Sequence, residues 1–381
     1  MTTVYIVRHA EAEGNIYRRI HGQYNSNLTE KGLLQVAALE ERFRPIHLDA
    51  VYSSDLRRCR MTARALYEPK GLPLHLNAGL REMNMGRWED RPWGEIGRLH
   101  PEGIRGFQTC SRSFRAPGGE SYVELRARVR DTIFRLAARH EGQTIAVSTH
   151  YIALRAALSA FWGFDVEEIP TRVPMSDNTA VSCVQIEGRE AKVLFACDNS
   201  HLTEELSTLN GQKWKKDGSI AAPESNLWYR PWDPEGEREL YLRFRRETWE
   251  QVHPGVPFDA EGFYRDAARC AAQDPWAVVC AMQGDAVAGL LQMDLERYRE
   301  EGAGFIFFYY MTPQAREQGL GIQLLGQAIS TFRPLGRTAL RLRCAPDNAL
   351  GLPFYLHHGF ADIGTAQTEP VELRLLEKRI D

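Results

Sequence analysis

The stretch Val4-Tyr5-Ile6-Val7-Arg8-His9-Ala10-Glu11 places a short apolar run directly before a polar cluster. An apolar run of this length indicates a buried strand, so the polar cluster is expected at that strand's carboxyl end. Strand-like and helix-like segments then alternate through residues 1–208. This alternation predicts an α/β domain of three layers (helix, sheet, helix). The sheet should be mostly parallel, with its chemistry at the carboxyl ends of the strands.

Further elements of this domain follow from apolar periodicity and capping signals. Thr29 is a candidate N-cap for a helix through Phe43. The other expected strands are Asp49–Ser53 and Thr144–Ser148. The other expected helices are one that ends near Leu66, and the ranges Tyr122–Ala138 and Tyr151–Trp162.

Polar clusters follow the expected strand ends along the chain. They are Arg8–Glu11, Ser53–Arg58, Arg81-Glu82 and Thr149-His150. Because parallel strands bring their carboxyl ends to one edge of a sheet, we expect histidines, arginines and one carboxylate to gather there. Each cluster alone is weak evidence, since such residues are common at protein surfaces, but the ordered set is specific.

This set of side chains suits phosphoryl transfer. A neutral imidazole is a nucleophile that can carry a phosphoryl group covalently. Arginine binds the phosphate oxygens through two parallel hydrogen bonds, which lysine cannot do. A carboxylic acid can protonate the leaving oxygen when its surroundings keep its pKa high.

The Arg8–Glu11 cluster, with Asn15, resembles the opening motif of the histidine phosphatase superfamily, which has the phosphoglycerate-mutase-like fold. Further matches are Leu28–Gly32, Ser53–Arg58 with Thr62-Ala63, and Leu80–Glu82. Met85–Glu89 and Pro117–Ser121 resemble the branch of small cobalamin-pathway and broad-specificity phosphatases. The resemblance covers about residues 1–200.

The resemblance implies a role for each matching residue. His9 is the nucleophile that becomes phosphohistidine, and Glu82 is the proton donor. The phosphate is held by the side chains of Arg8, Asn15, Arg58 and His150. The branch-like motifs and the absence of a long insertion favour hydrolysis over mutase chemistry. Tyr151 and Ile152 stand where the family usually has glycines, which leaves the substrate open.

A shift in composition divides the chain after this domain. Residues 209–225 mix Gly, Lys, Ser, Ala and Pro with little apolar periodicity, and we expect a linker there. Residues 226–381 then predict an α+β domain with an antiparallel start. Its expected helices are Asp259–Ala272, Leu320–Phe332 and Asn348–His358. Its expected strands are Trp276–Ala281, Val287–Leu295, Phe305–Met311 and Thr338–Arg343.

A glycine-rich turn, Arg316-Glu317-Gln318-Gly319-Leu320-Gly321, joins the aromatic strand Phe305–Met311 to the next expected helix. Backbone N–H groups at such a turn point toward an anion, and the helix dipole favours negative charge there. With Asn348 and Phe354–Phe360 further on, the turn resembles the motifs of the GNAT acyl-CoA-dependent N-acyltransferases over about residues 226–381.

This second resemblance implies acetyl-CoA as co-substrate and no metal. Tyr355 protonates the departing thiolate. The CoA-binding residues are Met311, Arg316, Gln318, Gly319, Leu320, Gly321 and Asn348. Many relatives carry a glutamate base on the central strand, but residues 304–310 contain no acid. A water-relayed base, a neutral incoming amine and a domain that only binds CoA therefore stay open.

The composition limits the classes of partner. The chain has 381 residues, 25% charged residues and a net charge of −3. Neither half is basic enough to indicate a nucleic-acid surface, and no apolar run is long enough to span a membrane. Seven cysteines without a Cys-x-x-Cys pair favour free thiols in a cytoplasmic protein over a zinc site.

The sequence thus predicts a bifunctional enzyme that acts on small-molecule phosphomonoesters and amines. One alternative is a phosphatase joined to a non-catalytic CoA-binding module. Another is a phosphoglycerate-mutase-type phosphotransferase in the N-terminal domain. The identity of both substrates and the oligomeric state stay open.

Overall fold

A computed structural model of the chain describes residues 1–211, 226–316, 318–368 and 371–381. The chain forms two compact units. The first lies within residues 1–211, except for Ile16–Arg18 and Pro92–Glu95, which group with residues 226–381 in the second. Most of the predicted linker lies outside the described residues, and its first residues, 209–211, belong to the short helix α9 (Thr208–Gly211).

The first unit is built on a six-stranded sheet in the order β3-β2-β4-β1-β5-β6. Its strands are β1 (Thr2–Arg8), β2 (Ala50–Ser53), β3 (Leu74–Leu76), β4 (Thr144–Thr149), β5 (Val181–Glu187) and β6 (Glu190–Asp198). The first four strands pair in parallel, as predicted. The antiparallel strands β5 and β6, which the sequence analysis did not predict, extend the sheet beyond β1.

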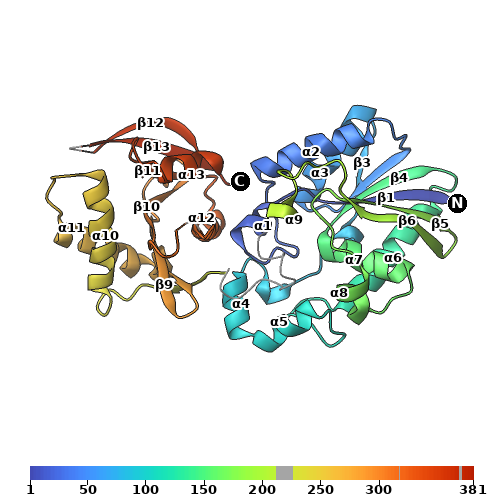
Figure 1. Cartoon of the computed structure of the whole chain (residues 1–381), viewed down its shortest axis with the longest axis horizontal. Coiled ribbons are helices and arrows are strands. Elements are labelled where there is room, and N and C mark those ends of the chain that lie inside the picture. Colours follow the sequence, from blue (N-terminus) through green and yellow to red (C-terminus); the bar gives the residue numbers. More distant parts are fainter. Residues whose placement is uncertain (212–225, 317, 369–370) are drawn as a thin grey trace. The chain divides into compact units, whose positions relative to one another are not determined.

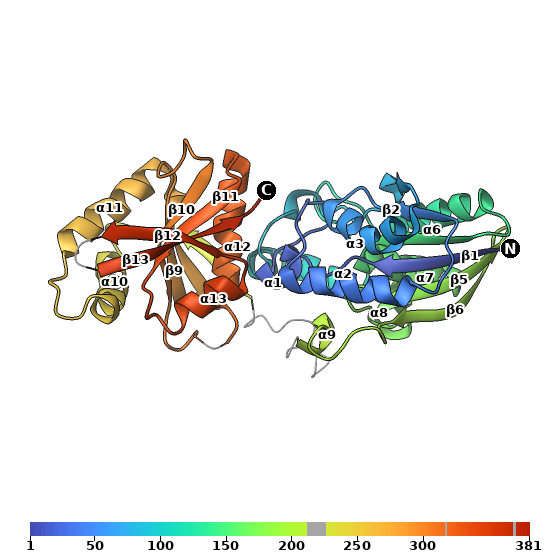
Figure 2. The ribbon, with the colours of Figure 1, turned by 90° about the horizontal axis from the view of Figure 1, so that it is seen from above.

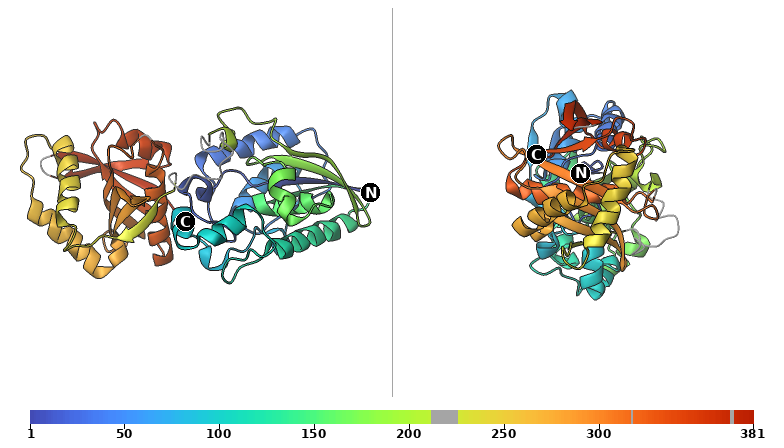
Figure 3. Two further views of the ribbon diagram at one scale, coloured as in Figure 1. Left: turned by 60° about the horizontal axis from the view of Figure 1, so that its bottom comes forward. Right: turned by 90° about the vertical axis from the view of Figure 1, so that its left-hand side faces the viewer.

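Helices cover both faces of this sheet, which confirms the predicted three-layer α/β class (Figure 1). The helices α2 (Glu30–Phe43) and α3 (Arg57–Tyr67) lie on one face, and α6 (Tyr122–Ala138) and α7 (Tyr151–Phe161) on the other. Shorter helices are α1 (Glu13–Tyr17), α4 (Trp93–Leu99), α5 (Pro101–Gln108) and α8 (Ile169–Arg172). Figure 3 shows this packing from two further directions.

Local sequence fixes where the longer helices begin. The Thr29 hydroxyl accepts a hydrogen bond from Gly32 N and caps α2, as predicted. Ser121 and Glu124 form a reciprocal capping box at the start of α6. Apolar side chains of α2 and α3, including Leu39, Phe43 and Leu66, then pack onto the strands in one buried cluster.

The second unit is built on a seven-stranded sheet in the order β12-β13-β11-β10-β9-β8-β7. Its strands are β7 (Trp228–Pro231), β8 (Val278–Gln283), β9 (Ala286–Asp294), β10 (Ala303–Met311), β11 (Ala339–Cys344), β12 (Ala361–Thr368) and β13 (Val371–Arg379). The neighbours β10 and β11 are parallel, while the other pairs are antiparallel. The predicted antiparallel start is present as the hairpin β8–β9, and the α+β class is confirmed.

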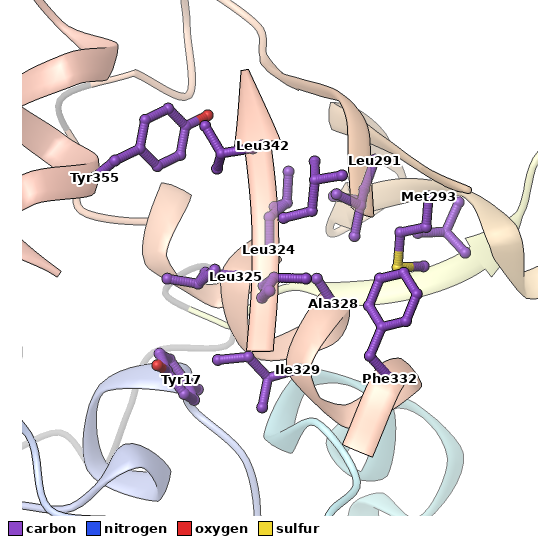
Figure 4. Packing of buried hydrophobic residues seen from close by; sticks show 14 of the residues in the cluster. Tyr17, Leu291, Met293, Leu324, Leu325, Ala328, Ile329, Phe332, Leu342 and Tyr355 are labelled. Atoms are coloured by element: carbon purple, nitrogen blue, oxygen red, sulfur yellow. The ribbon is translucent and has the colours of Figure 1, made fainter. Parts of the chain in front are cut away.

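Two buried clusters lie on opposite faces of this second sheet. The helices α10 (Arg238–Val252) and α11 (Ala260–Gln273) pack on one face. The helices α12 (Gly321–Phe332) and α13 (Gly351–His357) pack on the other (Figure 2). Figure 4 shows the core around α12, where Leu324, Ala328 and Phe332 contact the sheet. The sequence analysis did not predict α10, β12 or β13.

Within the described residues, every helix is too short or too polar to cross a lipid bilayer.

Gly304, in the central strand β10, lies directly over the ring of Phe332. A Cβ atom added at Gly304 would lie 2.3 Å from the nearest ring carbon of Phe332. We expect Gly304→Ala to lower the free energy of unfolding of the second unit by about 1–3 kcal/mol, because overpacking forces side chains out of their rotamers. Denaturant unfolding measures this change. Gly321→Ala in the same unit, where an added Cβ would lie at an ordinary contact distance of 3.7 Å from the Phe354 ring, is the control. Equal midpoints for both variants would contradict the expectation.

Candidate active site

Parallel pairing of β1 with β4 brings the first histidine cluster to the second. Arg8 lies opposite Thr149 in the register, and His9 N donates to Thr149 O at 2.9 Å. The rings of His9 and His150 therefore lie together, with their centroids 5.2 Å apart. The sequence placed both residues at strand ends, and the structure brings them into contact at the same edge of the sheet.

A hydrogen bond from the His9 ring to the backbone determines which of the two ring nitrogens keeps its lone pair. Its Nδ1 lies 2.7 Å from Ala10 O, a carbonyl that only accepts, so Nδ1 carries the hydrogen. In the neutral ring Nε2 then keeps its lone pair. Burial, with Arg58 and Arg8 nearby, lowers the pKa of His9 well below its usual value. The neutral, nucleophilic form is therefore favoured near neutral pH.

His150 is fully buried at the end of β4. Its Nε2 lies 2.9 Å from Ser54 Oγ and 3.3 Å from Cys59 Sγ. Burial and the charges of Arg58 and His9 lower the pKa of His150 well below its usual value. Burial also raises the pKa of the Cys59 thiol to about 12, so this cysteine is a protonated packing group rather than a nucleophile.

Arginines supply the positive charge of this site. Arg58 is 1% exposed and is fixed by hydrogen bonds to Gly22 O at 2.7 Å and Tyr24 O at 2.8 Å. Its neighbour Arg57 is exposed. Arg8 donates to Ser176 O and stacks on the Tyr151 ring, with its Cζ atom 4.7 Å from the ring centroid.

The side chain of Glu82 reaches the N-terminus of α7 from a different part of the chain. Its carboxylate accepts hydrogen bonds from Ile152 N at 3.0 Å and Ala153 N at 2.9 Å. Burial nevertheless raises the pKa of Glu82, because desolvation outweighs these hydrogen bonds and the charge of Arg58. A buried carboxyl with a raised pKa can hold a proton and donate it.

A polar segment after α8 holds the two motif residues in place, and the sequence analysis missed it. Asn178 Nδ2 donates to His9 O at 2.9 Å, and Thr179 N donates to Arg8 O at 3.1 Å. Thr179 has a φ of 58°, a strained conformation for a β-branched residue. The run Ser176–Thr179, polar yet directly before an apolar strand, was the available signal. Asn15 lies in α1, where its Oδ1 accepts from Ala12 N at 2.9 Å.

In the second unit, β10 and β11 separate part-way along their length. They pair only from Ala303 to Ile306 on β10 and from Ala339 to Leu342 on β11. The register of β10 against β9 shifts between Ile306 and Phe308, as at a β-bulge. Residues 307–311 of β10 therefore have no backbone pairing with β11. An extended ligand with amide groups fits such an edge.

The glycine turn leads from the end of β10 into α12. Gly319 has a φ of 73°, which a residue without a side chain adopts readily. Leu320 and Gly321 then start the helix, so its first N–H groups face this turn. The Arg316 side chain pairs with Glu247 at 2.7 Å and donates to Met311 O at 3.0 Å. Gln318 Oε1 accepts from Gln283 Nε2 at 3.0 Å. Residue 317 of the motif lies outside the described residues.

Tyr355 and Asn348 lie on the α12 side of the same sheet. Tyr355 is 8% exposed, and Figure 4 shows its hydroxyl pointing toward Leu342, the last β11 residue paired with β10. Burial raises the pKa of Tyr355, so the phenol stays protonated at neutral pH. Asn348 Oδ1 accepts from Gly351 N at 2.7 Å and shapes the start of α13.

Comparison with known families matches each unit separately. The model of the histidine phosphatase superfamily (branch 1) covers residues 4–199, just over half of the 381 residues. The chain belongs to this superfamily. The model of the acetyltransferase (GNAT) family covers residues 238–360, so the chain carries a GNAT domain at its C-terminal end.

Individual relatives resemble the first unit of this histidine phosphatase. Phosphoserine phosphatase 1 of Hydrogenobacter thermophilus is 30% identical over 204 residues, which cover 54% of this chain and 96% of that protein. The metal-independent phosphoserine phosphatase of Arabidopsis thaliana is 35% identical, over 41% of this chain and 67% of that protein. The solved structure of Bacillus stearothermophilus YhfR superposes with a TM-score of 0.51 at 28% identity. The superposed region covers 53% of this chain and 99% of the YhfR chain. The phosphoglycerate-mutase-like fold is thus confirmed.

Asn178→Ala tests whether the segment after α8 positions His9. The substitution removes the side-chain hydrogen bond to His9 O. We expect kcat/KM for phosphomonoester hydrolysis to fall about 10–100-fold, because a small displacement of a reacting group is costly.

Asn199→Ala is the matched control. This residue is bound to Asp177 Oδ2 at 3.1 Å in the neighbouring network, so its removal should leave kcat/KM close to wild type. Wild-type hydrolysis by Asn178→Ala would show that the hydrogen bond to His9 has no positioning role.

Proposed function

We propose that the first unit hydrolyses small phosphomonoesters through a phosphohistidine on His9. We also propose that the second unit transfers an acetyl group from acetyl-CoA to an amine. One observation carries the first proposal. His9 keeps Nε2 available because Nδ1 is bonded to Ala10 O, and Arg8, Arg58 and His150 surround this imidazole.

The first half-reaction moves the phosphoryl group to the enzyme. His9 Nε2 attacks phosphorus, an N–P bond forms and the P–O bond to the alcohol breaks. Arg8, Arg58 and His150 hold the equatorial oxygens, on which the transferring group spreads its negative charge. Protonated Glu82 gives its proton to the leaving oxygen, so the alcohol departs neutral.

The second half-reaction restores the enzyme. Glu82, now a carboxylate, takes a proton from a water molecule that attacks the phosphohistidine. The N–P bond breaks, inorganic phosphate forms and the imidazole returns to its neutral form. Neither half-reaction uses a metal ion, which agrees with the metal-independent name of the Arabidopsis relative.

The names of the relatives suggest a class of substrate. Two are phosphoserine phosphatases, while a Salmonella choleraesuis relative at 34% identity is named a probable phosphoglycerate mutase. We favour hydrolysis of a phosphorylated small metabolite, with O-phosphoserine as the first compound to assay. Phosphate release without a diphosphorylated product would separate hydrolysis from mutase chemistry.

For the second unit, the separated strands and the glycine turn fit acetyl-CoA. The free edge of β10, with Met311 nearest the turn, would hold the amide-bearing arm, and the amides from Gly319 to Gly321 would hold the pyrophosphate. Arg316, Gln318 and Asn348 shape this site. When bound, acetyl-CoA supplies the acetyl thioester, and Tyr355 is placed to give a proton to the thiolate that leaves.

A non-catalytic CoA-binding module is the second candidate for this unit. The observation that favours it is the apolar and aromatic character of β10, which carries no carboxylate from Ala303 to Met311. Transfer then requires an amine that arrives neutral or a base reached through water. Acetylated product from an amine panel would exclude the non-catalytic candidate.

His9→Ala tests the phosphohistidine directly. Phosphatase turnover should be abolished, because no other described group at the site can take the phosphoryl group from the same position. Acid-labile label from a ³²P-labelled substrate should appear on His9 in acid-quenched wild type. Substantial turnover by the variant would overturn the mechanism.

Glu82→Gln tests proton donation. Alkyl phosphates should lose about 10²–10⁴-fold in kcat/KM, while a nitrophenyl ester should lose little, because nitrophenolate leaves without a proton. The pKa of Glu82 is raised and the protonated form is active, so wild-type activity toward alkyl phosphates falls as pH rises through that pKa. The variant should lack this alkaline limb. Equal losses for both esters would assign Glu82 to phosphate binding.

Tyr355→Phe tests the acid of the acetyl transfer. We expect kcat for acetylation to fall about 10²-fold, with acetyl-CoA affinity unchanged, because the phenol acts on the leaving thiolate. Tyr264→Phe, which removes a long hydrogen bond of 3.4 Å to Pro234 O in the same unit, is the matched control. Steady-state kinetics and calorimetric titration with CoA measure the two effects. An unchanged kcat would remove Tyr355 from the mechanism.

A further inference from the structure

Three arginines gather around the aromatic rings of β10, on the face of the second sheet opposite α12. Arg245 comes from α10, Arg297 from the loop after β9 and Arg343 from β11. The Cζ atoms of Arg297 and Arg343 lie 4.7 Å and 5.7 Å from the Phe305 ring centroid. We call Arg245, Arg297 and Arg343 the arginine cluster.

Arg245 is enclosed by rings rather than by carboxylates. Its Cζ atom lies 4.1 Å from the Phe263 centroid, 4.5 Å from Phe308 and 5.3 Å from Phe307. Its Nε is buried without a hydrogen-bond partner among the described residues. Burial lowers the pKa of Arg245, and Asp266 acts on it only at longer range, without an ion pair. The guanidinium is thus desolvated and only weakly neutralised.

Arg343 lies on the neighbouring strand β11. Leu342 and Cys344 face α12, so the alternation of the strand places Arg343 on the opposite face. Its Nε is also buried, and no described residue accepts a hydrogen bond from it. The next arginine on this face differs, because Arg341 pairs with Glu377 at 2.7 Å and also with Glu301.

The arginine cluster lies where the strands separate. Arg343 is the first β11 residue after Leu342, and Phe307 is the first β10 residue after Ile306, the last pair in the parallel ladder. Phe307 and Phe308 both belong to the cluster of α10 and α11, as the β-bulge allows. The glycine turn and α12, in contrast, lie at the far end and on the other face of β10. An acceptor that reaches the bound thioester from the side of α10 and α11 would meet this cluster.

Arg245 and Arg343 each have a buried Nε without a hydrogen-bond partner among the described residues, which costs free energy that an anionic ligand recovers. We propose that the arginine cluster binds an anionic oxygen group, carboxylate or phosphate, of the acceptor amine, and that the phenylalanine rings contact its apolar part. This inference rests on the proposed acetyl transfer for its setting. It narrows the acceptor from any amine to an amine that carries a negative group, such as an amino acid.

If both units act on one metabolite, a carboxylate is the better candidate than a phosphate for the anionic group that the arginine cluster binds. Hydrolysis of a phosphorylated amino acid removes the phosphate but leaves the amine and the carboxylate. An acceptor held through its carboxylate would still bind the arginine cluster after that step.

The first experiment measures binding to the full chain saturated with CoA. Calorimetric titration compares L-phenylalanine with 2-phenylethylamine and L-serine with 2-aminoethanol, pairs that differ only in the carboxylate. We expect each amino acid to bind at least 10-fold more tightly than its partner. O-Phosphoethanolamine, in the His9→Ala background so that its phosphate is retained, tests phosphate as the anion.

Arg245→Met and Arg343→Met should each remove most of this preference, with little effect on the neutral amines. Arg246→Met, at the exposed next position of α10, is the matched control and should keep the preference. Thermal unfolding checks that the variants are folded. Equal affinity for charged and neutral amines, no binding of the anionic amines, or a preference that survives both substitutions would overturn the inference.

Acetylation assays with the same compounds separate this inference from the proposed function. Arginine-dependent binding without acetylated product would refute the transfer activity and leave the anion site standing. Acetylation of neutral and anionic amines at equal kcat/KM would support transfer and overturn the anion site.

Discussion

The parallel pairing of β1 with β4 is the constraint on which the phosphate site depends. It sets Arg8 opposite Thr149, so the two histidines that follow these strands meet at one edge of the sheet. Neither histidine is near the other in sequence. A slip of one residue in this register would turn the side chains of β1 to the opposite face and separate the pair.

Burial determines the chemical state of the groups that this pairing collects. The same desolvation keeps His9 and His150 neutral and favours the protonated form of Glu82. The positive charge of the site is left to Arg58 and Arg8, which stay protonated because their intrinsic pKa is far above neutrality. One physical effect thus prepares the proposed nucleophile and the proposed acid together.

The two units use buried arginine in comparable ways. In the first, Arg58 is anchored by backbone carbonyls, which orient the guanidinium but do not neutralise it. In the second, Arg245 and Arg343 are held against aromatic rings, which attract a cation more weakly than a carboxylate does. Both arrangements leave positive charge that an anionic ligand can neutralise. They differ in that the first follows a recognisable sequence motif and the second does not.

The sequence by itself determined the two fold classes and most strand and helix positions, and it singled out the residues of the proposed phosphate site. These follow from local signals such as the cap at Thr29 and the motif around His9, which depend on neighbouring residues alone. The tertiary structure decided that Asn178 bonds to His9, that β5 and β6 extend the first sheet, and that Arg245 and Arg343 both lie against rings of β10. Such contacts join segments far apart in the chain, and hydrophobic packing selects them without leaving a periodic pattern in the sequence.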